Sequence, residues 1–354
     1  MLLKKAKELG EAMIPSFNSP SGIPYNTWNL TKGLTENGYR PYDNSMGLLS
    51  QAGTLQLEYM KLAQLTGNSS FFYKVQNITD VLDKAEKKIP GLYPVYISHE
   101  TGNFPNYDFI SFGGNADSFY EYLIKQYIYV GGAIDQYKRM YEESIDGMHN
   151  YLIKEGQIKG HPDLLFIGSL YYNSFISQME HLACFVPGML AIGAKILDRP
   201  KDLEVAIKLG ETCYWSYNST PTGIGPESFT FLQKNPTLDE QSRLKLSLKQ
   251  KQKDIFFPDG VYGMNGYYWL RPETVESLFI LYRVTGDKSY QEKGWKIWQS
   301  IEKWCKTKTA YSGIFHVASK NAKQINNMES TPDVISLDTY VFNTEAHPFL
   351  RMKV

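Results

Sequence analysis

Acidic side chains recur at the beginning of segments with helical periodicity, each just after a loop that contains glycine or proline. Asp117 follows a loop with two glycines and precedes Glu121 by one helical turn. Arg271 and Glu273 flank a proline at the start of a later segment, with Glu276 one turn further on. Carboxyl groups gathered in an apolar, aromatic setting suit glycoside hydrolysis, which needs a general acid and a general base on either side of the bond.

Two further segments begin in the same way, one with the pair Glu180-His181 and one with Glu329. If these helices run parallel, their starts meet at one mouth and form an acidic, aromatic-walled cup. An acidic residue in a first turn also stabilises any helix through its dipole, so each carboxylate alone is better explained as a cap. Capping does not explain Arg271 beside Glu273 on so apolar a helix, which favours the functional interpretation.

Other chemistries find no support in the sequence. The six histidines show no HExxH spacing, and the chain contains no GxSxG, Walker or GxGxxG motif. Lys+Arg and Asp+Glu both number 37, so the formal charge is zero, which argues against a nucleic-acid partner. No apolar run approaches the roughly 20 residues that a membrane span needs.

The cysteines and the glycosylation triplets are informative about the cellular compartment of the protein. Cys184, Cys213 and Cys305 are too few and too scattered for a zinc ribbon or a small disulfide scaffold. The first 13 residues are typical of an amphipathic helix rather than a signal peptide, so we expect the chain to be incomplete at its N-terminus. Four N-x-S/T triplets, which we place in turn-like surroundings, favour the secretory pathway; they begin at Asn29, Asn68, Asn77 and Asn218.

A repeated helix pair must position the acidic groups. In each pair the first helix is more apolar than the second, which is typical of stacked helical hairpins that close into an α/α barrel with inner and outer layers. We therefore predict an all-α fold, a single domain over residues 1–354, with function in the long loops 16–50, 90–115, 155–177 and 220–270. The predicted pairs are 54–66 with 71–84, 116–130 with a helix through about 152, 178–197 with 203–217, and 273–286 with 290–304.

Six stretches of the sequence carry a resemblance to a known family. They are GLYPVYI (91–97), GGNADSFYEYLIKQ (113–126), MEHLACFVPGMLAIGA (179–194), LRPETVESLFILYRVTGD (270–287), NNMES (326–330) and VFNTEAHP (341–348). With these stretches the chain resembles glycoside hydrolase family 47, the class I α-1,2-mannosidases of the endoplasmic reticulum and Golgi. The stretches follow the family's order over nearly the whole chain, and VFNTEAHP and RPETVES are specific motifs.

The resemblance implies a fold and a reaction. The fold is an α/α barrel of seven helix pairs with a small C-terminal β-hairpin that includes the NTEAHP segment, and the barrel of this chain is expected to be incomplete. The reaction is the calcium-dependent, inverting removal of α-1,2-linked mannose from high-mannose N-glycans of glycoproteins. Asp117 matches a catalytic carboxylate, and Glu273 matches the general base that activates water. Thr344 matches the Ca²⁺ ligand, which binds through its hydroxyl and carbonyl oxygens, an arrangement suited to a hard cation.

The resemblance also implies binding residues and a compartment. Cys184 and Cys213 match a disulfide pair, which leaves Cys305 free. The location is the lumen of the endoplasmic reticulum or Golgi, reached by a signal or anchor outside this chain. The residues expected to bind the innermost sugar are His181, Arg271, Glu276, Glu329 and Glu345, together with Glu121.

This sequence departs from the family pattern at four points. The family's general-acid glutamate lies on a helix pair upstream of Met1, and Gln51 stands where a glutamate usually faces the site. Asn115 replaces an arginine associated with branch choice, and Glu329 is not followed by the expected apolar helix. We therefore expect impaired activity from the chain as written. The alternatives are a non-catalytic high-mannose glycan-binding protein of glycoprotein quality control, and a gene-model artefact that folds poorly.

Overall fold

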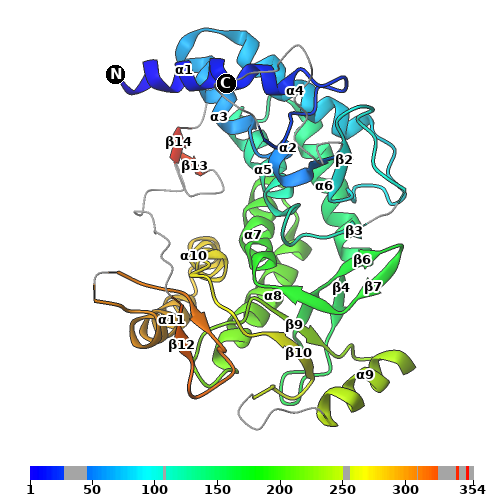
Figure 1. The fold of residues 1–354 in the computed structure, drawn as a ribbon, viewed down its shortest axis with the longest axis vertical. Coiled ribbons are helices and arrows are strands. Elements are labelled where there is room, and N and C mark those ends of the chain that lie inside the picture. Colours follow the sequence, from blue (N-terminus) through cyan, green and yellow to red (C-terminus); the bar gives the residue numbers. More distant parts are fainter. Residues whose placement is uncertain are drawn as a thin grey trace.

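Helical hairpins dominate the computed structural model, which describes residues 1–27, 46–106, 109–249, 256–308, 310–325, 340–342 and 348–350. The predicted amphipathic N-terminal helix is present as α1 (Leu2–Met13), followed by a 3-10 helix, Ile14–Phe17. In Figure 1, α1 lies at the top of the molecule and the helices of the second half of the chain lie below it. This architecture confirms the predicted fold class.

The four predicted helix pairs are all formed. In each pair the two helices pack against each other, and the first helices of successive pairs also contact one another, as inner helices of an α/α barrel do. The pairs are α3 (Gln56–Thr66) with α4 (Ser69–Lys84), α5 (Asp117–Tyr129) with α6 (Asp135–Tyr151), α7 (Val186–Leu197) with α8 (Pro200–Asn218), and α10 (Glu273–Thr285) with α11 (Ser289–Trp304).

Two inner helices end at a glycine for the same reason. Gly67 after α3 and Gly286 after α10 adopt left-handed conformations, with φ of 68° and 76°. A residue with a Cβ is strained in this region, whereas glycine is not. The shared Thr-Gly therefore ends each inner helix and turns the chain into the outer helix.

Short strands lie within the predicted loop regions, and β8 leads almost directly into the turn that begins an inner helix. The two three-stranded sheets have the orders β3 (Phe109–Ile110), β6 (Ser169–Tyr171), β7 (Ser174–Ile176) and β10 (Val261–Asn265), β9 (Ser228–Phe231), β8 (Gln178–Glu180). The antiparallel pairs are β1 (Met46–Leu48) with β2 (Tyr96–Ser98), β4 (Ile153–Glu155) with β5 (Leu165–Ile167), β11 (Ile314–Phe315) with β12 (Lys323–Gln324), and β13 (Tyr340–Phe342) with β14 (Pro348–Leu350). The last pair confirms the expected C-terminal hairpin.

Some predicted boundaries were wrong. The helix expected from residue 178 begins as a 3-10 turn, η2 (Leu182–Phe185), because residues 178–180 pair with β9 instead. Two helices were not predicted, α2 (Leu49–Gly53) and α9 (Leu238–Lys249). The glycosylation triplet at Asn77 lies within α4 rather than in a turn.

Most of the large aromatic side chains belong to the core. Tyr120 is fully buried and stacks on Phe112 with ring centroids 3.7 Å apart, and Phe166 stacks on Phe231 at 4.6 Å. The aromatic abundance in the sequence was compatible with a core or with a sugar cleft. The largest fully buried aromatic residues belong to the core, where each ring removes a large apolar area from water.

The disulfide expected from the resemblance is formed between Cys184 and Cys213, whose Cα atoms lie 5.8 Å apart. It joins η2 to α8, near the beginning of an inner helix. Cys305 is the free, buried thiol, and its burial raises its pKa to about 12. Among the described residues, no helix combines the length and apolar character required to cross a membrane.

Candidate active site

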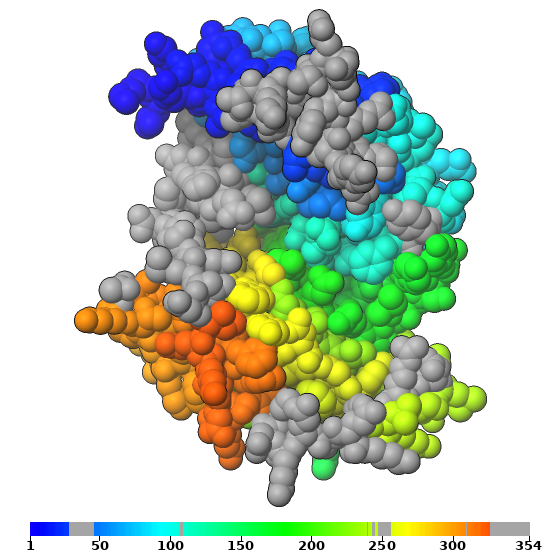
Figure 2. Space-filling model, in the orientation of Figure 1, coloured from blue at the N-terminus to red at the C-terminus, as the bar shows by residue number. Residues whose placement is uncertain are grey.

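An open pocket of about 410 Å³ lies where the N-terminal ends of the inner helices meet. In Figure 2 the surface is hollowed where the yellow segment that contains α10 approaches the blue and cyan segments. The parallel inner helices thus bring together acidic groups from separate parts of the chain. The lining residues are Ser50 and Gln51 of α2, Asp117, Ser118 and Glu121 of α5, Leu182 and Phe185 of η2, Arg271, Pro272, and Glu273 and Glu276 of α10.

Glu273 is held from behind by a buried histidine. The Nδ1 atom of His181 lies 3.0 Å from Oε2 of Glu273, and its Nε2 atom lies 2.6 Å from the hydroxyl of Tyr217. An ionised carboxylate only accepts hydrogen bonds, so Nδ1–H donates to Glu273 and Nε2 of the neutral ring accepts from Tyr217. Burial raises the pKa of Tyr217 well above its ordinary value, which keeps this proton on the tyrosine. The arrangement fixes both the orientation and the tautomer of His181.

Asp117 is a carboxyl group that holds its proton unusually well. Its pKa is raised to about 6, mainly by burial and further by the negative charges of Glu121, Glu273 and Glu180. The backbone N–H of Ser118 donates to Oδ1 at 2.9 Å and partly offsets this effect. A carboxyl group with such a pKa can exchange a proton near neutral pH.

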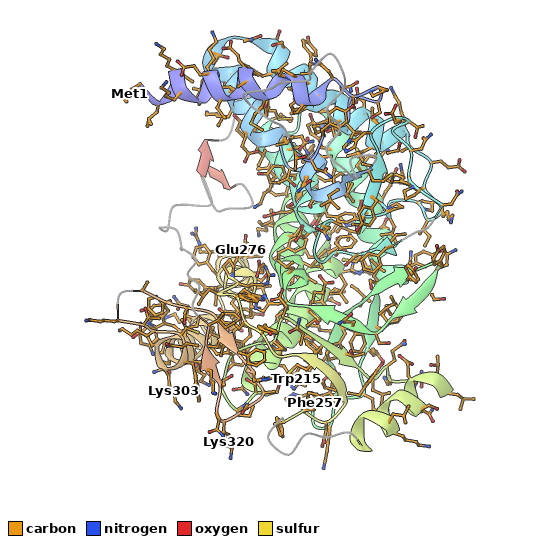
Figure 3. The ribbon with its side chains drawn as sticks, viewed as in Figure 1. Met1, Trp215, Phe257, Glu276, Lys303 and Lys320 are labelled. Atoms are coloured by element: carbon orange, nitrogen blue, oxygen red, sulfur yellow. A yellow bond between two sulfur atoms is a disulfide. The ribbon has the colours of Figure 1, made fainter. Side chains whose placement is uncertain are left out.

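A buried ion pair lies on the same helix. Lys125 is paired with Glu121 one turn away, and both residues are about 5% exposed. Glu276 of α10 faces this pair: burial and the charge of Glu121 raise its pKa to about 7, and Lys125 opposes the rise. Figure 3 labels Glu276 on α10, beside the green helices. Lys125 thus limits the charge repulsion between Glu121 and Glu276.

Arg271 is clamped by a glutamate that the sequence analysis missed. Its Nε atom donates to Oε1 and Oε2 of Glu227 at 2.9 and 2.7 Å, and Nη2 forms an ion pair with the same carboxylate. Glu227 lies in Pro-Glu-Ser, which resembles the Pro-Glu-Thr that contains Glu273. That similarity was the available signal for Glu227, whereas Tyr217 and Lys125 carried none beyond their place in helical segments.

Three residues that the sequence analysis singled out lie at or near the rim. The carboxylate of Glu180 accepts a hydrogen bond from the N–H of Gly114 at 2.7 Å, so it holds the loop before Asp117 rather than lining the pocket. Asn115 is exposed with φ of 70°, and its carbonyl accepts from the N–H of Ser50 at 2.9 Å. Gln51 lines the pocket itself. The expected site residues Glu329, Thr344 and Glu345 lie outside the described residues.

The donor set of the pocket suits a hard cation. No group of three or more His, Cys, Asp or Glu side chains arranged to hold a metal ion occurs in the described part of the chain. The pocket offers carboxylate oxygens, while both ring nitrogens of His181, which lies behind Glu273, are already engaged. Oxygen donors without free nitrogen or sulfur are compatible with Ca²⁺ and unsuited to zinc.

Comparisons with known proteins point to one family. The sequence profile described as Glycosyl hydrolase family 47 matches residues 1–351. The chain is 37% identical to the Arabidopsis thaliana mannosyl-oligosaccharide 1,2-alpha-mannosidase MNS1, over 98% of this chain and 60% of that protein. It is 34% identical to the endoplasmic reticulum mannosyl-oligosaccharide 1,2-alpha-mannosidase of Homo sapiens, over 98% of this chain and 49% of that protein. The chain thus spans about half to three-fifths of the length of these relatives.

Solved structures agree with the sequence comparisons. The alpha-1,2-mannosidase from Trichoderma reesei superimposes with a TM-score of 0.82 at 30% identity, covering 99% of this chain and 74% of that one. A family 76 glycoside hydrolase from a bovine Bacteroides thetaiotaomicron strain matches with a TM-score of 0.57 at 12% identity, covering 85% of this chain and 57% of that one. The second likeness concerns the fold alone.

Proposed function

Because the chain belongs to glycosyl hydrolase family 47, we propose that it removes terminal α-1,2-linked mannose from high-mannose N-glycans with inversion at the anomeric carbon. The observation that supports this most is that Glu273, oriented by buried His181, lines the same pocket as the proton-holding Asp117. Inverting hydrolysis requires such a pair of carboxyl groups, one to activate water and one to protonate the leaving oxygen.

Glu273 is the proposed general base. The N–H of His181 binds one carboxylate oxygen, so the other oxygen is free of this bond and can accept a proton from an attacking water. The hydrogen bond from His181 also fixes the rotation of the carboxylate. The base therefore needs little reorganisation when the reaction begins.

Asp117 is the described carboxyl group best suited to supply a proton. Its pKa of about 6 leaves a sizeable protonated fraction near neutral pH. Arg271, held rigidly by Glu227, and the Glu121–Lys125 pair would bind sugar hydroxyls, for which charged groups are strong hydrogen-bond partners.

Calcium is the proposed cofactor, with Thr344 as the protein ligand and His181, Glu276, Glu329 and Glu345 in the surrounding sugar site. When bound, Ca²⁺ would supply positive charge that holds sugar hydroxyls and lowers repulsion among the carboxylates. The all-oxygen donor set of the described pocket supports this choice of metal.

The proposed location is the lumen of the secretory pathway. The disulfide Cys184–Cys213 and the glycosylation triplets favour an oxidising, glycosylating compartment. The human relative is named for the endoplasmic reticulum, in agreement with this location.

Mass spectrometry of a high-mannose N-glycan incubated with the purified chain tests the proposal. In keeping with the impaired activity expected from the sequence, we expect slow, stepwise loss of single hexoses in the presence of Ca²⁺, none with chelator, and none from a Glu273→Gln variant. A folded wild-type chain that leaves the glycan intact would contradict the proposal.

Glycan binding without hydrolysis is the second candidate function. Gln51 supports it, because this pocket residue carries a neutral amide where the family resemblance expects a carboxylate. In the same experiment, retention of an intact glycan on the immobilised chain would favour binding over trimming.

A further inference from the structure

Two aromatic side chains form a stacked pair immediately before Arg271. The rings of Tyr267 and Trp269 lie parallel, with an interplanar angle of 3° and centroids 5.4 Å apart. Phe315 approaches Tyr267 with centroids 4.6 Å apart. All three side chains remain partly exposed, unlike the fully buried aromatic residues of the core.

Strand geometry determines which way these rings point. The N–H and C=O groups of Tyr268 both bond to Ile314, at 3.0 Å in each direction, so the two segments pair locally as antiparallel strands. Side chains alternate across such a pair. Tyr268 and Ile314 are 2% and 0% exposed and point inward, so Tyr267, Trp269 and Phe315 point outward. In Figure 1 the orange hairpin of β11 and β12 lies beside the yellow segment that leads into α10.

The same pairing ties the stacked rings to the pocket. On its inner side, Tyr268 packs against Tyr217 and His181, with ring centroids 6.1 Å away in both cases. The N–H of Glu227 donates to the carbonyl of Tyr267 at 2.8 Å, and the Glu227 side chain clamps Arg271 in the pocket lining. The rings are therefore the outer surface of the wall whose inner surface supports Glu273.

Backbone strain accompanies this arrangement. Leu270, between Trp269 and Arg271, has φ of 60°, and His316, which follows Phe315, has φ of 62°. Bulky residues are strained in this region, and such strain persists where the surrounding structure enforces it, commonly at binding sites. Here the conformation of Leu270 sets the directions in which the side chains of Trp269 and Arg271 leave the backbone.

We propose that Tyr267, Trp269 and Phe315 form a sugar-stacking platform for a mannose residue beyond the bond that is cleaved. The platform would bind the same glycan that fills the pocket, so its role rests on the proposed function. The apolar face of a hexose matches a flat aromatic surface. The neighbouring Arg271–Glu227 pair presents both charges, which suits a neutral, hydroxyl-rich ligand rather than an anion.

Two ligands of different length separate the platform from the pocket. Isothermal titration calorimetry is run with α-1,2-linked mannobiose, which fills only the pocket, and with a free high-mannose oligosaccharide, which would reach the platform. All titrations use a Glu273→Gln background so that no ligand is consumed. We expect the oligosaccharide to bind more tightly than the mannobiose, and Trp269→Ala to weaken the oligosaccharide roughly tenfold while changing the mannobiose by less than about twofold.

Two further variants serve as controls for the Trp269→Ala titrations. Trp269→Phe keeps an aromatic face and should retain most of the oligosaccharide affinity. Trp298→Ala removes an exposed tryptophan of α11 and should change neither ligand. Equal weakening of both ligands by Trp269→Ala, or no weakening of either, would overturn the platform. Wild-type trimming activity together with oligosaccharide binding no tighter than mannobiose would overturn the platform and leave the proposed function standing.

Discussion

At the scale of single residues, the site depends on side chains that never reach the substrate. Tyr217 is 1% exposed and its hydroxyl lies 2.6 Å from Nε2 of His181, on the side away from Glu273. The hydroxyl of Tyr217 donates to Nε2, so the ring proton of His181 lies on Nδ1, where it binds Glu273. The tyrosine is therefore a positioning residue for the base.

Tyr217→Phe should lower kcat about tenfold and leave KM nearly unchanged, because one hydrogen bond that orients the base is lost. The pH profile of kcat should also change, since Nε2 of His181 is no longer bound by the Tyr217 hydroxyl and can take up a second proton. Steady-state kinetics between pH 5 and pH 8 measure both effects. Tyr290→Phe, on the outer helix α11, serves as the control. A rise in KM alone would contradict the positioning role.

The raised pKa of Glu276 predicts a pH-dependent stability. Its pKa is about 7 in the folded protein and 4.5 in the unfolded chain. Between these values the folded state binds the proton more tightly, so the free energy of unfolding falls as pH rises through this window. Discounted for partial exposure, the loss is about 1–3 kcal/mol.

Glu276→Gln should remove that part of the pH dependence. We expect the variant to be more stable than wild type at pH 7.5 and nearly equal to it at pH 4.5. Urea denaturation with chelator present gives the two free energies. Glu292→Gln, an exposed change on α11, provides the comparison. A wild-type chain that gains stability from pH 5 to pH 7 relative to Glu276→Gln would show the sign to be wrong.

At the scale of elements, two glycines of similar appearance play opposite roles. Gly286 ends α10 with φ of 76°, whereas Gly294 lies within α11. A Cβ at either position would meet no atom within 4 Å, so only the backbone distinguishes them. Gly286→Ala should therefore destabilise the protein by about 1 kcal/mol, and Gly294→Ala should stabilise it by about 0.5–1 kcal/mol. Thermal and urea unfolding of both variants measure the difference, and equal signs would contradict the assignment.

Sequence periodicity was sufficient to predict the four helix pairs and insufficient to predict the strands. The inner helices are apolar, and α3 and α10 end at Thr-Gly, so their pattern is local and could be predicted. The two- to five-residue strands depend on partners far away, as β8 with β9 does, and such short segments lack a readable alternation. The boundary error at residue 178 follows from this, because Gln178–Glu180 were predicted to begin a helix and instead form β8.

The site was predictable to the same extent. Asp117, Glu121, Glu273 and Glu276 lie at helix starts, and the parallel helices bring them together. Glu227 and Tyr217 reach the site through hydrogen bonds that span 44 and 36 residues of sequence, and no local pattern reports such pairs. Thr344, which was assigned from the resemblance alone, stays a prediction.

At the scale of the whole molecule, the described helices leave one inner helix incompletely covered. On α10, Leu278 and Ile280 are buried, yet Phe279 is 37% exposed. A helix that is apolar nearly all round normally has protein on every side. The exposed side chain is compatible with the incomplete barrel expected from the sequence.

Calcium links this global stability to the proposed site. A cation that binds only the folded chain raises the free energy of unfolding by RT ln(1 + [L]/Kd), about 2.7 kcal/mol when the ion is present at 100 times Kd. Ca²⁺ should therefore raise the melting temperature, and EDTA should reverse the change. Because Asp117 and Glu276 repel neighbouring carboxylates, the stabilisation should be larger at pH 7.5 than at pH 5, where their protonation removes part of that repulsion.

Thr344→Val provides the matched variant, since it removes the hydroxyl donor and keeps the shape of the side chain. Differential scanning calorimetry of wild type and variant, with Ca²⁺ and with EDTA, gives the four melting temperatures. We expect the variant to lose most of the calcium-dependent rise while its melting temperature in EDTA matches that of wild type. An identical calcium-dependent rise in the melting temperature of both proteins would mean that the ion binds away from Thr344. A wild-type melting temperature indifferent to Ca²⁺ would remove calcium from the proposed function.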